Sequence, residues 1–356
     1  MQALNTTNLF DINNILRENI KKTKPYSSAR DEYKGTEGVF LDANENPLGS
    51  VTKENYNRYP DPLQKEVKNR LGKIKGVNSE QIFLGNGSDE AIDLLFRAVC
   101  KPGVDNVITM PPTYGMYEVS ANINDVEVKE IPLSADFEIR IENVLTAIDQ
   151  HTKMIFVCSP NNPTGNCLKQ ESIETILNRF NGLVVIDEAY IDFAPGKTFV
   201  NKLDQYPNLV VLQTFSKAWG MAGLRLGIAY ASKEIITVIN KIKPPYNINQ
   251  YTQALALEAL DNSSKKDAMV TEILLQRGAL IKGFSGIKFI TKIYPSDANF
   301  VLIKTEDGKK VYDFLVDKKI ITRDRSKVTL CEGCIRITVG TKEENELLLK
   351  VLKEYK

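Results

Sequence analysis

Four short polar segments of the chain combine residue types that could do chemistry, and each one follows an apolar run. They span residues 85–90, 159–165, 187–190 and 215–225. The first, GNGSDE, places two glycines ahead of a helical pattern, where the backbone can approach a ligand and exposed N–H groups favour a phosphate. It lacks both the third glycine of a dinucleotide fingerprint and the lysine of a P-loop. It therefore predicts either a phosphate cradle of another type or a plain strand–helix turn.

The other three segments supply an amide, a carboxylate and an amine. Asn162 lies between two prolines, which would keep its side chain aimed at a ligand oxygen. Asp187 ends an apolar run, and a carboxylate buried there needs a cationic ligand, a salt bridge or a helix cap as its partner. Lys217 follows another apolar run, and Arg225 lies eight residues further on. Partial burial and a nearby cation would lower the pKa of this amine and make it nucleophilic, while an ordinary surface lysine is the alternative.

Seven apolar runs that alternate with helical patterns must position these segments. This alternation over residues 80–231 predicts an α/β fold, whose large domain has a seven-stranded, mostly parallel sheet between helices. The expected strands span 81–84, 106–110, 126–131, 153–158, 183–187, 209–214 and 226–231. Such sheets bind ligands beyond the carboxyl ends of their strands, which is where all four polar segments fall.

A smaller α+β domain is expected beyond the Pro-Pro pair at 244–245. Its helical patterns cover about 250–260, 265–283, 308–318 and 341–355, and its strands are expected at 298–304 and 335–339. The predicted organisation is thus a large domain over 49–246 and a small domain over 247–356. Residues 1–48 are expected to form an N-terminal segment that packs with the small domain.

Composition argues against several classes of protein. Lys plus Arg total 46 against 45 Asp plus Glu, so the chain lacks the basic excess typical of proteins that bind nucleic acid or membrane surfaces. It shows no apolar run of membrane-spanning length and no signal-peptide pattern, which favours a cytoplasmic location. A single histidine, His151, argues against histidine-based hydrolysis. Because the only close cysteine pair is Cys331 and Cys334, we expect free thiols and no metal site.

A phosphate cradle, a rigid amide, a buried carboxylate and a nucleophilic lysine together are what pyridoxal 5'-phosphate requires. The sequence also resembles the fold type I pyridoxal-phosphate aminotransferases, and within them the histidinol-phosphate branch. The matching motifs are LDANENPLG at 41–49, RYPDP at 58–62, GNGSDEAI at 85–92, SPNNPTG at 159–165, VVIDEAY at 184–190, TFSKAWGMAGLRLG at 214–227 and RITVGT at 336–341.

The resemblance implies a role for each residue of the cofactor site. Lys217 would form the Schiff base and act as general acid and base, while Asp187 would pair with the ring nitrogen. Asn162 and Tyr190 would hydrogen-bond the ring 3-oxygen, and Tyr114 would stack on the ring. The cofactor phosphate is expected among Gly87, Ser88, Asp89, Ser216 and Arg225, joined by Tyr59 of the partner subunit in a homodimer.

The same resemblance implies the substrates. Arg336 would bind a carboxylate and Arg323 the substrate phosphate, because a guanidinium fork suits both groups. The pocket would also be lined by Tyr26, Asn44 and Tyr246. The implied reaction is transamination of L-histidinol phosphate with 2-oxoglutarate to imidazole-acetol phosphate and L-glutamate, in L-histidine biosynthesis. An aromatic amino acid aminotransferase and a phosphothreonine decarboxylase of the same fold are the alternatives.

Overall fold

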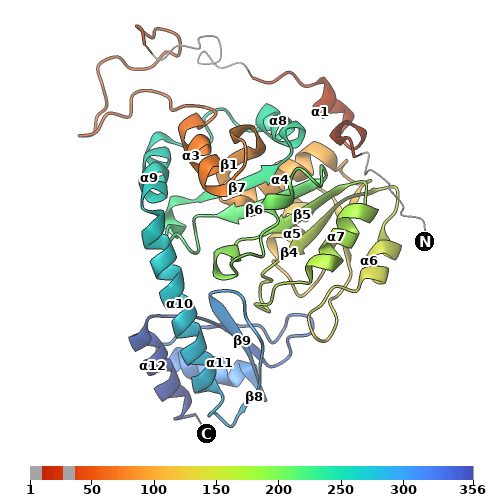
Figure 1. Cartoon of the computed structure of the whole chain (residues 1–356), viewed down its shortest axis with the longest axis vertical. Helices are drawn as coiled ribbons and strands as arrows, with labels where there is room; N and C mark the ends of the chain where they lie inside the picture. The colour runs from red at the N-terminus through yellow and green to blue at the C-terminus, as the bar shows by residue number, and fades with distance from the viewer. Residues whose placement is uncertain (1–9, 27–36, 356) are drawn as a thin grey trace.

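A seven-stranded sheet forms the centre of the computed structural model, which describes residues 10–26 and 37–355 (Figure 1). The strand order is β1-β7-β6-β5-β4-β2-β3, and β7 runs antiparallel to β1 and β6 while the other pairs are parallel. The strands are β1 (Ile82–Asn86), β2 (Asn106–Thr109), β3 (Glu127–Glu130), β4 (Thr152–Cys158), β5 (Leu183–Asp187), β6 (Leu209–Thr214) and β7 (Leu226–Ala231). All seven predicted strands are confirmed, as is the mostly parallel α/β architecture.

Helices cover both faces of this sheet, because its central strands are apolar on both sides. In β4, Met154 and Phe156 pack with one set of helices, while Ile155 and Val157 pack with the other. The first set comprises α4 (Ser88–Val99), α5 (Met116–Ile123) and α8 (Lys233–Ile242). The second comprises α3 (Lys65–Lys75), α6 (Ile141–Ala147) and α7 (Gln170–Arg179). Single 3-10 turns lie at Ile12–Asn14, Ser79–Gln81, Ile191–Phe193, Val200–Lys202 and Ala222–Leu224.

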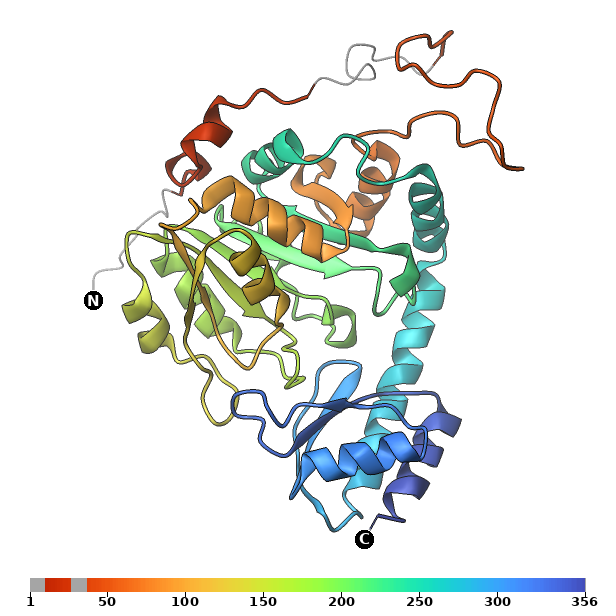
Figure 2. The same cartoon turned by 180° about the vertical axis from the view of Figure 1, so that it is seen from behind.

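A smaller unit lies at the carboxyl end of the chain, beyond a long helix that extends away from the large sheet (Figures 1 and 2). Its four strands pair antiparallel in the order β10-β11-β9-β8. Their bounds are β8 (Ile290–Ile293), β9 (Phe300–Thr305), β10 (Arg323–Asp324) and β11 (Cys334–Thr338). The helices are α10 (Ser263–Phe284), α11 (Gly308–Asp317) and α12 (Lys342–Leu352), which bury one face of the small sheet.

The core of this small unit begins later than the predicted boundary at 247. Helix α9 (Gln250–Asp261) contacts α3, and its Ala256 and Leu260 belong to the core of the large unit. The apolar side chains that fill the small core start within α10, at Leu280 and Phe284.

The N-terminal segment packs on the large unit, so its expected packing with the small domain is wrong for residues 10–22. Ile12, Leu16 and the Ile20 of α1 (Glu18–Lys22) form an apolar stripe that joins the core cluster of α4 and α8. The backbone N–H of Arg17 donates to the carbonyl of Ala98 (3.1 Å), and Lys241 Nζ donates to the carbonyl of Ile20 (2.7 Å).

Residues 37–60 extend away from the large unit as an irregular arm (Figures 1 and 2). Four of its apolar side chains, Val39, Leu41, Leu48 and Val51, are at least 87% exposed. Within residues 10–26 and 37–355, the helices are all too short or too polar to cross a membrane.

Candidate active site

The carboxyl ends of β4, β5 and β6 open onto one cavity, and all the predicted cofactor residues except Tyr59 line it. These are Gly87, Ser88, Asp89, Tyr114, Asn162, Asp187, Tyr190, Ser216, Lys217 and Arg225. Cys158, Ala189, Thr214 and Ala222 complete the lining. The four polar segments of the sequence therefore meet in space. His151 precedes the amino end of β4, the end away from this cavity.

One end of the cavity has the features of an anion site. Helix α4 begins at Ser88 and presents its free N–H groups there. Gly87 has φ +72°, and a Cβ at this position would lie 2.8 Å from Nη2 of Arg225. Arg225 Nη1 donates to Ser216 Oγ (3.4 Å), while Nη2 lies 3.7 Å from a carboxylate oxygen of Asp89. Helix N-terminus, guanidinium and hydroxyl thus converge on a space that suits a phosphate.

Asp187 supplies a buried carboxylate to the lining of the cavity. The hydroxyl of Tyr117 donates to its Oδ2 (2.8 Å), and the backbone N–H of Ala189 donates to its Oδ1 (3.0 Å). Burial raises the pKa of Asp187, and these two hydrogen bonds oppose the rise. Among the described residues Asp187 has no ion-pair partner, so the site fits a ligand that brings a cationic N–H.

Lys217 follows β6 and places its amine 5.6 Å from the centre of the Tyr190 ring. Partial burial lowers the pKa of Lys217, and the positive charges of Arg336 and Arg225 lower it further. Asp187 acts in the opposite direction. The net lowering raises the fraction of unprotonated amine near neutral pH, which is the form that attacks a carbonyl.

Arg336 links the small unit to this cavity. Its Nη1 donates to Oδ1 of Asn162, and its guanidinium lies over the ring of Phe300, 5.2 Å from the centre. Arg323 lies directly opposite Arg336 in the β10–β11 pair. The structure thus brings Arg336 to the cavity and places Arg323 beside it.

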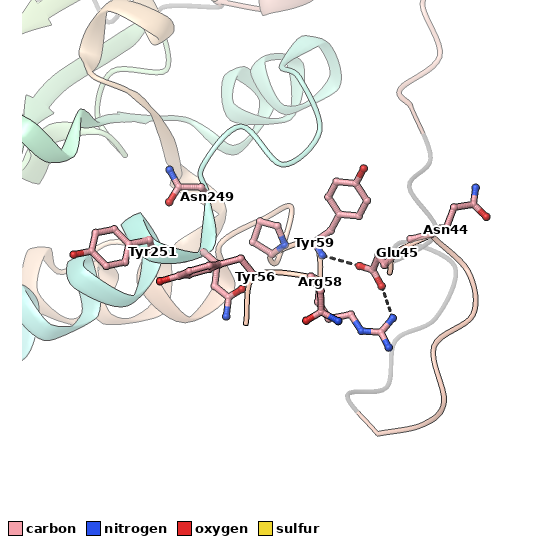
Figure 3. A pocket seen from close by; sticks show the side chains of 11 residues that line it. Asn44, Glu45, Tyr56, Arg58, Tyr59, Asn249 and Tyr251 are labelled. Carbon is pink, nitrogen blue, oxygen red and sulfur yellow. Dashed lines mark hydrogen bonds and ion pairs between the residues drawn. The ribbon is translucent and has the colours of Figure 1, made fainter. Parts of the chain in front are cut away.

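Tyr26, Asn44, Tyr59 and Tyr246 do not line the Lys217 cavity within one chain. Asn44 and Tyr59 line a separate pocket between the arm and the start of α9 (Figure 3). There Glu45 accepts hydrogen bonds from Arg58 Nη1 (2.7 Å) and from the backbone N–H of Tyr59 (2.6 Å). Tyr246 stacks on Tyr59 with ring centres 4.4 Å apart, and Tyr26 is 71% exposed.

The sequence model of the family "Aminotransferase class I and II" matches residues 30–352. The chain belongs to this family. The aminotransferase is 63% identical to a histidinol-phosphate aminotransferase of Cytophaga hutchinsonii over 97% of its own length and 99% of that relative. It is 53% identical to the histidinol-phosphate aminotransferase of Flavobacterium johnsoniae, again over 97% and 99% of the two chains. The predicted resemblance is confirmed.

Solved structures agree with the aminotransferase fold. The histidinol-phosphate aminotransferase of Clostridium acetobutylicum superimposes with a TM-score of 0.78 at 26% identity, covering 84% of this chain and 90% of the other. The enzyme from Sinorhizobium meliloti, solved with pyridoxal-5'-phosphate, gives a TM-score of 0.79 at 24% identity over 88% and 89% of the two chains. At that identity the second likeness supports the fold alone.

Two polar residues of the aminotransferase site were not predicted. Tyr117 is fully buried and bonds Asp187, and Thr214 accepts a hydrogen bond from the backbone N–H of Ser216 (3.1 Å). Tyr117 lies in the first turn of α5, three residues after Tyr114, which precedes the helix, and the two rings meet edge to face with their centres 5.5 Å apart. That spacing is the signal by which the sequence could have revealed it.

Proposed function

We propose that the chain transfers the amino group of L-histidinol phosphate to 2-oxoglutarate, giving imidazole-acetol phosphate and L-glutamate in L-histidine biosynthesis. The observation that carries the proposal is 63% identity to a histidinol-phosphate aminotransferase over almost the whole of both chains. The cavity around Lys217 supports it, because this cavity holds the amine, the carboxylate and the anion cradle that such a reaction uses. A cytoplasmic location stays a prediction.

The cofactor we infer is pyridoxal 5'-phosphate, and the residues of the cavity fit its groups. Its phosphate would be held by Ser88, Ser216, Arg225 and the backbone of Gly87 and Asp89. Asp187 would pair with the ring nitrogen, Asn162 and Tyr190 would face the 3-oxygen, and Tyr114 would lie against the ring. When bound, such a cofactor supplies an aldehyde and an electron-withdrawing ring that make the α-proton of an amine acidic.

Lys217 would be both the covalent partner of the cofactor aldehyde and the group that carries the proton. Its free amine would take the α-proton of the bound donor and later give a proton back, so one residue would serve as base and then as acid. The lowered pKa of Lys217 favours its role as a base. The single histidine, His151, lies at the other end of β4, so Lys217 would carry out this proton transfer without a histidine.

On the substrate side, we infer that Arg336 binds the carboxylate of 2-oxoglutarate and that Arg323 binds the phosphate of the donor. Arg336 is already oriented by Asn162 and Phe300, so its fork needs little reorganisation to accept an anion. The roles of Tyr26, Asn44 and Tyr246 as pocket residues stay predictions.

We further propose that the active form is a homodimer in which Asn44 and Tyr59 serve the partner's site. Both lie in the arm and line a pocket other than the Lys217 cavity of their own chain. The exposed apolar side chains of the arm also favour its burial against a second copy, since this would remove apolar surface from water.

An absorbance titration of the purified, cofactor-loaded protein tests the proposed reaction. L-Histidinol phosphate should convert the cofactor to its amino form, and 2-oxoglutarate should reverse the change. Conversion by L-phenylalanine but not by L-histidinol phosphate would make the chain an aromatic amino acid aminotransferase. Carbon dioxide release from O-phospho-L-threonine would make it a decarboxylase.

The variant R323A separates the substrates further. We expect it to raise KM for L-histidinol phosphate at least about tenfold more than KM for L-glutamate, because a charged hydrogen bond to the phosphate is lost. Equal changes would remove Arg323 from the phosphate site.

A further inference from the structure

Three arginines share one face of the small sheet. Arg323 and Arg336 lie directly opposite each other in the antiparallel β10–β11 pair. Arg325 follows Arg323 by two residues, and its backbone N–H donates to the carbonyl of Cys334 (2.9 Å), which continues the ladder. Because side chains alternate along a strand, the side chains of Arg323 and Arg325 leave the sheet on the same side as that of Arg336.

This face turns toward the large unit and the Lys217 cavity. Leu302 and Cys334, which lie on it, belong to the core cluster that includes the large sheet. Ile335 and Ile337 point the other way, into the core of the small unit. Arg336 reaches from this face to Asn162, one of the residues that line the Lys217 cavity.

The three arginines have no acidic partner within the described residues. Like charges placed directly opposite on a sheet repel each other. Burial and the charges of Arg323 and Arg336 lower the pKa of Arg325. The Nε of Arg325 is shielded from solvent yet has no hydrogen-bond acceptor. Because Arg325 and Arg336 are partly buried, an anion from outside the chain would compensate their positive charges.

We propose that Arg325 is a specificity-determining residue that acts with Arg323 and Arg336 to bind the phosphate group of the amino donor. The inference rests on the proposed function, in which the two substrates bind in turn: Arg336 would meet the carboxylate of 2-oxoglutarate in one half-reaction and share the donor phosphate with Arg323 and Arg325 in the other. A carboxylate balances one guanidinium, whereas a phosphate carries nearly two negative charges and three acceptor oxygens. The cluster therefore suits a phosphorylated donor better than an amino acid.

The variants R325Q and R325K test this assignment in the holoenzyme, with K327Q as a matched control. Lys327 is an exposed cation two residues further along the chain. Dissociation constants are measured by absorbance titration with L-histidinol phosphate and with L-histidinol, which lacks the phosphate. We expect R325Q to weaken binding of L-histidinol phosphate about tenfold or more and binding of L-histidinol less than twofold. R325K should fall between wild type and R325Q, because it keeps the charge but loses the fork.

Equal weakening of both donors would overturn the proposal, because it would show a purely structural role, and so would unchanged binding of L-histidinol phosphate. Calorimetric titration of the holoenzyme with orthophosphate provides a readout without turnover. If wild type failed to react with L-histidinol phosphate, the proposed function would fall, yet orthophosphate would still test the cluster. If R325Q bound orthophosphate about tenfold more weakly than wild type, the result would support a phosphate site at the three arginines. Unchanged binding of orthophosphate would overturn the proposal.

Discussion

The hydroxyl of Tyr117 lies 2.8 Å from Oδ2 of Asp187, and both side chains are buried beneath the site. The Tyr117 ring stacks on Phe156 and meets the edge of Tyr114, so its position is fixed from two sides. This hydrogen bond favours the ionised form of a carboxylate whose pKa burial raises. Tyr117 is therefore a positioning residue for Asp187.

The variant Y117F should weaken turnover without loosening the fold. A hydrogen bond to a charged group contributes about 1.5–3 kcal/mol. If its loss raises the activation free energy by that amount, kcat should fall about 10- to 100-fold. Because the pKa of Asp187 then rises further, the acidic limb of the pH–rate profile should move to higher pH. The control is Y230F, which removes a buried hydroxyl that has no partner. A shift of the acidic limb in both variants, or in neither, would contradict the assignment.

Replacement of Lys217 by Ala should abolish both turnover and the visible absorbance of the loaded protein. We expect a loss of about 10³-fold or more, because one residue provides the covalent link and the proton transfer. K197A is the control, since Lys197 forms a half-exposed ion pair with Asp297 (3.2 Å) that contributes little. Activity near the wild-type level in K217A would refute the role of this lysine.

Gly87 should be essential for the anion cradle. In G87A the new Cβ would meet Arg225 Nη2 at 2.8 Å, and the backbone at φ +72° and ψ 168° is nearly exclusive to glycine. We expect affinity for pyridoxal 5'-phosphate to fall about tenfold or more, measured by equilibrium dialysis. G76A has a similar φ of +70° with open space around the Cβ. It should lower thermal stability but keep cofactor affinity, and equal losses of affinity would remove Gly87 from the cradle.

Glu188 should make stability depend on pH. Burial raises its pKa from 4.5 to about 7, although Phe199 N–H, the Thr198 hydroxyl and the Gln213 amide donate to it. Between these values the folded chain holds a proton that the unfolded chain releases, so this contribution to stability is lost as pH rises. The free energy of unfolding of wild type should therefore fall relative to E188Q by up to about 3 kcal/mol between pH 5 and pH 8. Urea unfolding at four pH values measures the free energy of unfolding of both proteins. A difference between wild type and E188Q that stays constant with pH would argue against the raised pKa of Glu188.

The sequence predicted the large sheet because its strands carry their own signal. Runs such as LVVID at 183–187 are apolar on both faces and end at polar loops, so local pattern and burial agree. Strands β8 and β10 were not predicted. The first is half-exposed, and the second has two residues that are ordered by pairing with β11. Such strands depend on partners distant in the chain, which local pattern does not reveal.

The cofactor cavity was predictable because its residues follow the ends of strands that the sequence predicts, and these ends meet at one edge of the sheet. Tyr117 was not predicted, because its contact with Asp187 joins positions that are 70 residues apart. The predicted packing of residues 10–22 was wrong. The stripe of Ile12, Leu16 and Ile20 predicts that one face is buried, but it does not predict which surface of the protein buries that face.

Helix α10 begins beside the large unit and ends in the core of the small one, and its 22 residues span about 33 Å as a rigid rod. At this length, a tilt of about 5° at its start would displace its far end by roughly 3 Å. Two hydrogen bonds also join the two units near the site, one from Arg336 to Asn162 and one from the backbone N–H of Asp297 to the carbonyl of Gly165 (2.7 Å). An anion that took the guanidinium of Arg336 away from Asn162 would therefore remove one of several connections between the two units, and the others would still hold α10 in place.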